Sequence, residues 1–348
     1  MKVPFTWKVT GWFMVGWSAE FARGEVRPLH YFGEDLVAYR DEYGELHILT
    51  GHCRHLGAHI GYGGKVVGDC VECPFHGWRW GPDGTNRKIP GEDRVNRVLR
   101  LRVYPVHEQH GCVFMWHHPD GAPPKWEMPD ILRVFPELDS DPAGYYRPYP
   151  EFSRKAEREP VHPQVVLENG PDSLHFEYVH HATVTPKMLR YSADGHLWTF
   201  LTGWPDARSA DPDAMALEIH AQMFGLGGSI SAFDGSSKHR LIFATTPVDD
   251  GHSDLFYSIW WPKEPGEDSD VAPPGIRELV EKRFLVTVWE DLSIWRHQKY
   301  VERPPLSARD AKPFLSLRQW AQQFYDVPPP GAGDSVDSAN TRPEQPIR

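Results

Sequence analysis

The stretch Gly51-His52-Cys53-Arg54-His55 is followed, after seventeen intervening residues, by Cys73-Pro74-Phe75-His76. Cys53 and His55 form a C-x-H pair, and Cys73 and His76 form a C-x-x-H pair. Two thiolates and two imidazoles are the ligands of a [2Fe–2S] centre in which the cysteines bind one iron and the histidines bind the other. The predicted cluster ligands are therefore Cys53, His55, Cys73 and His76.

A zinc site is the competing interpretation of the same segments. Cys70 and Cys73 form a C-x-x-C pair, which is a common zinc-binding spacing. Zinc would not explain the glycines that accompany both ligand pairs. A disulfide scaffold is excluded as a class, because the chain has 348 residues and only four cysteines.

Around these segments, short apolar stretches indicate β-strands over the first third of the chain. Leu36–Arg40 and Leu46–Leu49 flank the mostly polar segment Asp41–Gly44, as the strands of a hairpin do. Val98–Val106 and Cys112–Trp116 are two further candidates. Closely spaced short strands predict a small β-barrel or sandwich.

A proline-rich stretch that starts at Ala122-Pro123-Pro124-Lys125 is the expected junction between two domains. The first domain would cover residues 1–125, with an N-terminal extension, and the second would cover residues 126–326. In the second domain, strands are mixed with two helical candidates, Val165–His181 and Pro274–Val301. The sequence therefore predicts an α+β fold in two domains.

Composition narrows the class of protein. The net charge of −11 argues against nucleic acid or an anionic membrane surface as the main partner. No apolar run approaches the roughly 20 residues that a membrane-spanning helix needs, and residues 1–16 lack the apolar core of a signal peptide. We therefore expect a soluble, cytoplasmic protein. The segment 327–348 is rich in Pro, Gly, Ser and charge, and is expected to be disordered.

Cys53–Ala58 and Cys73–Trp78 resemble the two cluster-binding loops of Rieske oxygenases. Arg54 departs from the proline that the family often has at this position, and Cys70 is not a ligand by the resemblance. The stretch Glu168–His181 resembles the N-x-x-D-x-x-H-x-x-x-x-H signature of the catalytic domain in the same family. The resemblance implies an N-terminal all-β Rieske [2Fe–2S] domain, followed by an α+β catalytic domain whose antiparallel sheet and helices carry a mononuclear iron.

This signature indicates a second metal site. Two histidines and one carboxylate form the facial triad that binds Fe(II) and leaves positions open for O₂, and the resemblance assigns His175 and His180 to it. Residues five apart are about 140° apart around a regular helix, so the helix must widen or end between them for both imidazoles to reach one metal. His181 is the alternative to His180.

The same signature contains Asn169 and Asp172, which the resemblance implies as further site residues. In the family, the equivalent aspartate links a cluster histidine of a neighbouring subunit to a histidine of the catalytic iron. Asp172 lies three residues before His175, so on a helix the two side chains would share a face. The alternative is an ordinary carboxylate at a helix N-terminus, where the helix dipole favours negative charge.

The third iron ligand is expected well downstream. Apolar residues recur at helical spacing from Val280 to Trp295, and Asp291 falls on the same stripe. A charge on a buried face is costly unless it is paired or binds a metal, which favours Asp291 as the carboxylate ligand. Glu290 points about 100° away on a helix and is interpreted as a solvated residue.

The stretches Glu290–Gln298 and Arg318–Trp320 resemble the C-terminal part of ketosteroid 9α-hydroxylases and of related cholesterol 7-desaturases. The resemblance implies a terminal monooxygenase of steroid metabolism, which uses O₂ to hydroxylate an apolar polycyclic substrate and assembles as a homotrimer. The chain has no Gly-rich dinucleotide motif, so electrons from NAD(P)H must arrive through a separate flavin and iron–sulfur reductase or a ferredoxin. A steroid or sterol desaturase, another Rieske monooxygenase or demethylase, and a Rieske electron-transfer protein remain alternatives.

Overall fold

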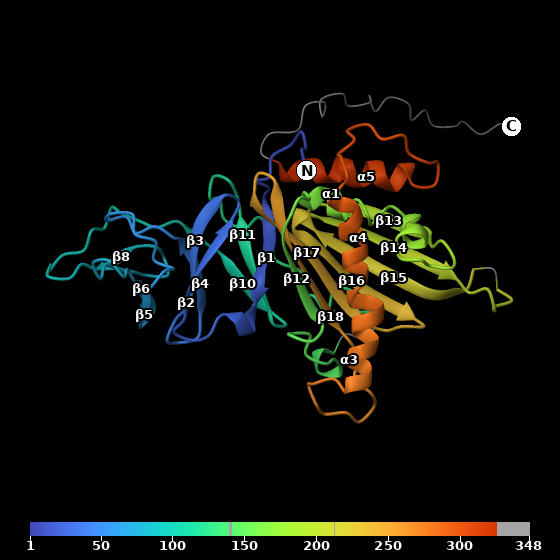
Figure 1. Ribbon diagram of the computed structural model, residues 1–348, viewed down its shortest axis with the longest axis horizontal. Helices are drawn as coiled ribbons and strands as arrows, with labels where there is room; N and C mark the ends of the chain where they lie inside the picture. The colour runs from blue at the N-terminus through green and yellow to red at the C-terminus, as the bar shows by residue number, and fades with distance from the viewer. Residues whose placement is uncertain (139–140, 212, 326–348) are drawn as a thin grey trace, which may run out of the picture.

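The structure is a computed structural model that describes residues 1–138, 141–211 and 213–325. It has two β-rich parts that lie side by side, with small sheets of N-terminal strands at one end and a large sheet at the other (Figure 1). The segment 327–348, which is predicted to be disordered, lies outside the described residues. No helix in the described part of the chain is long and apolar enough to cross a membrane.

The N-terminal part consists of three small antiparallel sheets. The first holds β1 (Gly11–Trp17), β11 (Cys112–His117) and β10 (Val106–Gln109). The second holds β2 (Val26–Tyr31), β3 (Glu34–Arg40), β4 (Leu46–Thr50) and β9 (Val103–Tyr104). The third holds β5 (Lys65–Val67), β6 (Cys70–Glu72), β7 (Arg79–Trp80) and β8 (Asn86–Lys88). The two cysteine–histidine segments are the loops that follow β4 and β6.

The sequence predicts only some of these strands. The β3–β4 hairpin and the strand at β11 are confirmed. The expected strand Val98–Val106 is wrong, because only residues 103–104 and β10 are extended. The side chain of Asn96 accepts hydrogen bonds from the N–H groups of residues 98 and 99, which holds a turn at that point. Pro105 then separates β9 from β10, since proline has no N–H to donate to a neighbouring strand.

A seven-stranded antiparallel sheet forms the centre of the C-terminal part. Its order is β12 (Ser153–Glu159), β18 (His252–Trp260), β17 (Arg240–Asp249), β16 (Gly228–Gly235), β15 (Met215–Phe224), β14 (Leu197–Pro205) and β13 (Lys187–Asp194). From β13 to β18 each strand pairs with the next one along the chain, and β12 joins at the β18 edge. The connection from β12 to β13 contains the histidine signature.

Helices lie over one face and one end of this sheet (Figure 1). They are α1 (Pro163–Leu167), α2 (His175–Tyr178), α3 (Pro274–Val280), α4 (Thr287–Trp295) and α5 (Ala311–Ala321). A π-helical segment, Glu281–Leu285, joins α3 to α4, so that the two form one column across the sheet in Figure 1. Single 3-10 turns lie at Ser18–Glu20, Pro142–Gly144, Gly225–Gly227 and Gln322–Phe324.

Both helical candidates are confirmed only in part. Val165–His181 divides into α1 and the single turn α2, because Gly170-Pro171 interrupts it and proline disfavours helix at the residue before it. Pro274–Val301 is helical as far as Trp295 and then ends. The predicted apolar stripe is buried against the sheet at Val280, Val288 and Trp295.

The two parts of the chain share one hydrophobic core. Trp17 of β1 belongs to this core and donates from Nε1 to Ser258 Oγ of β18 at 2.9 Å. Two backbone hydrogen bonds of 2.8 Å join the β2–β3 turn to the end of β17. A Cβ atom on Gly227 would lie 1.8 Å from the carbonyl oxygen of Trp12, so this close approach of the two backbones requires glycine. The N-terminal part is therefore held firmly against the large sheet.

Of the buried histidines, His117, His162 and His239 are at most 1% exposed, and this burial keeps them neutral. Burial lowers the pKa of His117, His162 and His239 to about 3. A histidine in the unfolded chain titrates at about 6.5, so below that pH the unfolded state binds protons that the folded state does not. Their contribution to stability is present above about pH 6.5. It is lost as the pH falls toward 3, by about 1.4 kcal/mol per pH unit for each histidine.

Replacing His162 with Asn isolates one of these contributions. Nδ1 of His162 accepts a hydrogen bond from the N–H of Gln164 at the start of α1, and Asn is a good acceptor at this position that does not titrate. Between about pH 7 and about pH 5, the free energy of unfolding in urea should fall by about 2 kcal/mol less for His162→Asn than for the wild type. His297→Asn, at an exposed histidine, should behave as the wild type. Equal falls for all three proteins would contradict the prediction.

Candidate metal centres

The two cysteine–histidine loops have the same backbone design. In each loop the cysteine N–H donates to the carbonyl five residues later, and the glycine four residues later donates back to the cysteine carbonyl, at 2.8 to 3.0 Å. These glycines are Gly57 and Gly77, with φ values of 76° and 69°. Such left-handed backbone favours glycine. The turn around Cys53 and the turn around Cys73 therefore explain the glycines that zinc binding leaves unexplained.

The loops bring the two thiols together inside the domain and the two imidazoles together outside it. Cys53 and Cys73 are 2% and 3% exposed, whereas His55 and His76 are exposed, with ring centroids 4.8 Å apart. Burial raises the pKa of the Cys53 thiol. The Nε1 atom of Trp80 is buried and has no hydrogen-bond partner among the described residues, which suits a donor to a cluster sulfur.

This arrangement fits a two-iron cluster better than one zinc ion. Within residues 1–138, 141–211 and 213–325, the candidate ligand atoms of the two cysteines and the two histidines do not all lie within 4.8 Å of one another. Cys70 is engaged elsewhere, because its Sγ donates to Oδ1 of Asp69 at 3.1 Å. The structure thus places the four predicted side chains at one tip of the domain and leaves Cys70 aside.

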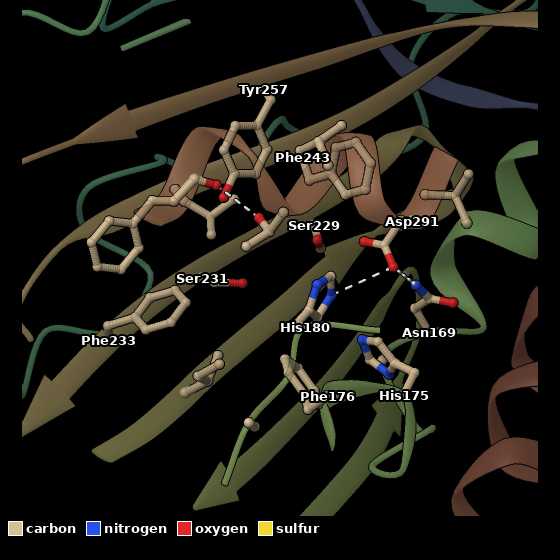
Figure 2. A pocket seen from close by; sticks show the side chains of 18 of the residues that line it. Asn169, His175, Phe176, His180, Ser229, Ser231, Phe233, Phe243, Tyr257 and Asp291 are labelled. Atoms are coloured by element: carbon tan, nitrogen blue, oxygen red, sulfur yellow. Dashed lines mark hydrogen bonds and ion pairs between the residues drawn. The ribbon is translucent and has the colours of Figure 1, made fainter. Parts of the chain in front are cut away.

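A second group of candidate ligands lies on α2, on the loop after it and on α4 (Figure 2). The ligand atoms of His175, His180 and Asp291 all lie within 4.8 Å of one another. Nε2 of His180 is 3.5 Å from Oδ1 of Asp291, and the amide of Asn169 donates to the same oxygen at 3.1 Å. Two imidazoles and one carboxylate so arranged can hold one iron and leave coordination positions open.

The chain accommodates the five-residue histidine spacing by ending the helix. The helix α2 is a single turn that stops at Tyr178, and His180 follows in the loop, with its ring centroid 5.2 Å from that of His175. The expectation that the helix widens or ends between the two histidines is confirmed. His181 is exposed, has a φ of 55° and is not part of the group.

Asp172 lies ahead of α2, so the expectation that it shares a helical face with His175 is wrong. Its carboxylate accepts hydrogen bonds from the N–H groups of Leu174 and His175 at 3.1 and 3.4 Å, as a carboxylate at a helix start does. The main-chain carbonyl of Asp172 accepts from Nδ1 of His175, which leaves Nε2 for a metal. The side chain of Asp172 also lines a cavity of about 150 Å³ that Asn169 and Arg318 share.

Glu290 has a role that the sequence analysis missed. Its Oε2 lies 2.9 Å from Nδ1 of His180, and its side chain is 30% exposed, so the interpretation of Glu290 as a solvated residue is wrong. Glu290 and Asp291 hold the two nitrogens of one imidazole, an arrangement that directs Nε2 toward the metal position. Burial lowers the pKa of His180, but its bonds to Asp291 and Glu290 raise it overall. The available signal in the sequence was that Glu290 is directly adjacent to Asp291, the predicted carboxylate ligand.

Glu290→Ala should lower the affinity of this site for Fe(II) by about 10- to 100-fold, because the His180 ring loses the partner that orients it. Glu290→Gln keeps an acceptor oxygen and should lose less. The iron retained after dialysis against increasing chelator concentrations measures the effect. Glu281→Ala is the control, because Glu281 is exposed and pairs with Arg154. If Glu290→Ala retains iron as well as Glu281→Ala does, Glu290 has no orienting role.

A cavity of about 380 Å³ opens directly onto the candidate iron ligands. Most of its wall is apolar and includes Phe176, Phe233 and Phe243, which surround the space in Figure 2. Ser229 and Ser231 add two hydroxyl groups from the same face of β16, because side chains two apart on a strand point the same way. Such a cavity fits an apolar ligand that carries a few polar groups.

Both halves of the chain match known protein families. Residues 11–105 match the Rieske [2Fe-2S] domain, and residues 115–325 match the 3-ketosteroid 9α-hydroxylase C-terminal domain. The oxygenase component of a 3-ketosteroid-9-alpha-monooxygenase from Rhodococcus rhodochrous is 30% identical over 329 residues, which cover 90% of this chain and 80% of that protein. A cholesterol 7-desaturase from Xenopus laevis is 28% identical, over 90% of this chain and 71% of that protein.

Solved structures show the same fold. Dicamba monooxygenase bound to 3,6-dichlorosalicylic acid has a TM-score of 0.66 at 19% identity, over 92% of this chain and 98% of that chain. NdmA from Pseudomonas putida with caffeine has a TM-score of 0.64 at 17% identity, over 89% of each chain. The expected all-β Rieske domain and α+β catalytic domain are thereby confirmed. The chain belongs to the family of Rieske-type non-haem iron monooxygenases that carry a [2Fe–2S] domain and a 3-ketosteroid 9α-hydroxylase C-terminal domain.

Proposed function

We propose that this monooxygenase is the terminal oxygenase of a multicomponent system and that it hydroxylates a steroid, in the manner of a 3-ketosteroid 9α-hydroxylase. The observation that carries the proposal is the apolar cavity of about 380 Å³ that ends at His175, His180 and Asp291. Its size and apolar wall suit a polycyclic substrate. The family match over residues 115–325 and the relative from Rhodococcus rhodochrous support the steroid class.

Each part of the two centres has a proposed role. The proposed ligands are Cys53, His55, Cys73 and His76 for the cluster, and His175, His180 and Asp291 for the catalytic iron. When bound, the iron supplies the reductive activation of O₂. Asn169 fixes the Asp291 carboxylate, and Glu290 fixes the His180 ring. The apolar walls hold the substrate with one C–H bond toward the triad and exclude water from it.

We also propose that electrons pass between subunits of a homotrimer. The imidazoles of His55 and His76 are exposed at the tip of the Rieske domain, and Asp172 lines a separate cavity on the catalytic domain. Contact between the tip of one subunit and Asp172 of the next would connect the two centres. Electrons reach the cluster from a separate NAD(P)H-dependent reductase or a ferredoxin, in the cytoplasm.

The proposed division of the chain into residues 1–125 and 126–326 is supported by the position of β11. This strand ends at His117 and pairs with β1 and β10 of the N-terminal part. A boundary shortly after β11, in the proline-rich stretch, keeps that sheet within one domain.

The proposed function is tested by turnover of the reconstituted enzyme, with a surrogate reductase, against a panel of steroids under ¹⁸O₂. An alcohol that contains one labelled oxygen atom supports hydroxylation. An alkene without label would favour the desaturase alternative, which the relative from Xenopus laevis supports. If no steroid in the panel is oxidised by enzyme whose cluster accepts electrons, the steroid class is wrong.

A further inference from the structure

The substrate cavity contains one charged side chain besides the candidate iron ligands. Arg283, Thr287 and Asp291 all line the cavity. They are spaced by four residues, so they form a row along one face of the helical column. Arg283 lies in the π-helical segment Glu281–Leu285, and π-helical turns are frequent at functional sites. The row leads from the candidate iron ligands to the guanidinium of Arg283.

Arg283 marks the opening of the cavity. Among the residues that line it, Arg283 alone is exposed. Its guanidinium makes no hydrogen bond or ion pair within the described ranges 1–138, 141–211 and 213–325. The charged residues beside it are already engaged, because Glu281 pairs with Arg154 and Lys282 pairs with Glu278. The cavity thus has a metal-binding end and, at its opening, a cation that can bind an anion.

We propose that the substrate is a polycyclic acid, and that Arg283 binds its carboxylate while the carbon to be oxidised lies at the iron end. This inference rests on the proposed function and narrows its substrate class. The guanidinium presents paired N–H donors in a plane, which match the two oxygens of a carboxylate. An ammonium group or a neutral ketone would not use this geometry.

The position of Arg283 also determines where the acid must be on the substrate. Arg283 and Asp291 are eight positions apart, which is at most about 12 Å along a helix axis, because part of this stretch is π-helical. The carboxylate therefore belongs at the end of the fused-ring skeleton remote from the oxidised carbon. Water at the opening weakens the attraction relative to a buried ion pair, so Arg283 should favour the acid over a neutral analogue by about tenfold in affinity.

The test measures binding without turnover. Cluster- and iron-loaded enzyme, with no reductase present, is titrated by calorimetry with a 3-oxo steroid whose side chain ends in a carboxylate and with the methyl ester of the same compound. The wild type should bind the acid about tenfold more tightly than the ester, and this difference should shrink at high salt. Arg283→Gln should weaken binding of the acid to the level of the ester and leave the ester unchanged.

Lys282→Gln is the matched control, since it removes the same charge one residue away from a side chain that does not line the cavity. It should change neither affinity. Equal binding of acid and ester by the wild type, or equal weakening of both by Arg283→Gln, overturns the role of Arg283 and leaves the steroid function standing. If the wild type binds neither compound, the proposed steroid class fails, and the inference fails with it.

Discussion

Asp291→Ala is expected to remove the catalytic iron and to bring product formation below detection, while the [2Fe–2S] cluster stays in place. Asp291 supplies the one carboxylate of the proposed triad, and the neighbouring Glu290 is held at the other nitrogen of the His180 ring. Loss of a direct ligand should exceed the roughly 10- to 100-fold effect that loss of an orienting partner has. Metal analysis should find cluster iron alone, and the visible spectrum should match that of the wild type.

Ser293→Ala is the control for Asp291→Ala, because Ser293 is exposed on the same helix. It should keep full iron content and activity. Unchanged activity of the whole system with Asp291→Ala would show that the chemistry occurs elsewhere. The chain would then act as a Rieske electron-transfer protein, which is the alternative that the sequence leaves open.

Cys73→Ala is expected to abolish the cluster and, with it, every reaction that depends on a reductase. The thiol of Cys73 is 3% exposed beside that of Cys53, so solvent cannot readily replace it as a ligand. Without one of its two thiolate ligands, the cysteine-bound iron is not held, and the cluster does not assemble. The visible absorption and the electron paramagnetic resonance signal of the reduced protein should disappear. The catalytic iron, held by the other domain, should remain at one per chain.

Cys70→Ala provides the discriminating control, since Cys70 is also buried and lies in the C-x-x-C pair. The cluster interpretation predicts that Cys70→Ala keeps the full cluster spectrum. A zinc site would be damaged by either substitution and would contain zinc instead of iron and sulfide. Equal loss of bound metal in the two variants would therefore refute the cluster ligands proposed for this domain.

The candidate ligands could be predicted because each one stands in a short local pattern. Cys53 and His55 are two residues apart, and Cys73 and His76 are three apart, so one loop presents each pair. Asp291 could be found because its burial stripe depends only on helical periodicity, and α4 follows that periodicity. The β3–β4 hairpin ahead of Cys53 was predictable for the same reason, since apolar runs and turn residues act over a few positions.

The contacts that were missed depend on where the chain bends. The path of the chain from Asp172 to His180 follows from the break at Gly170-Pro171 and the early end of α2, and neither is a helical repeat. That path turns the Asp172 carboxylate to the helix start and brings His180 to Glu290. The periodicity of a helix shows which of its faces is buried. It does not show which of its other residues a separate segment of the chain will contact. The periodicity alone therefore does not distinguish Glu290 from a solvated residue.

Because the two domains share one core, the chain is expected to unfold as one cooperative unit. The contact between Gly227 and Trp12, and the bond from Trp17 to Ser258, cross between the cluster domain and the catalytic sheet. A fragment that ends after β11 would leave the buried residues of β1 without their partners on β17 and β18. Heat should therefore unfold both domains in a single calorimetric transition, and loss of packing beneath one metal centre should lower the thermal stability of the other.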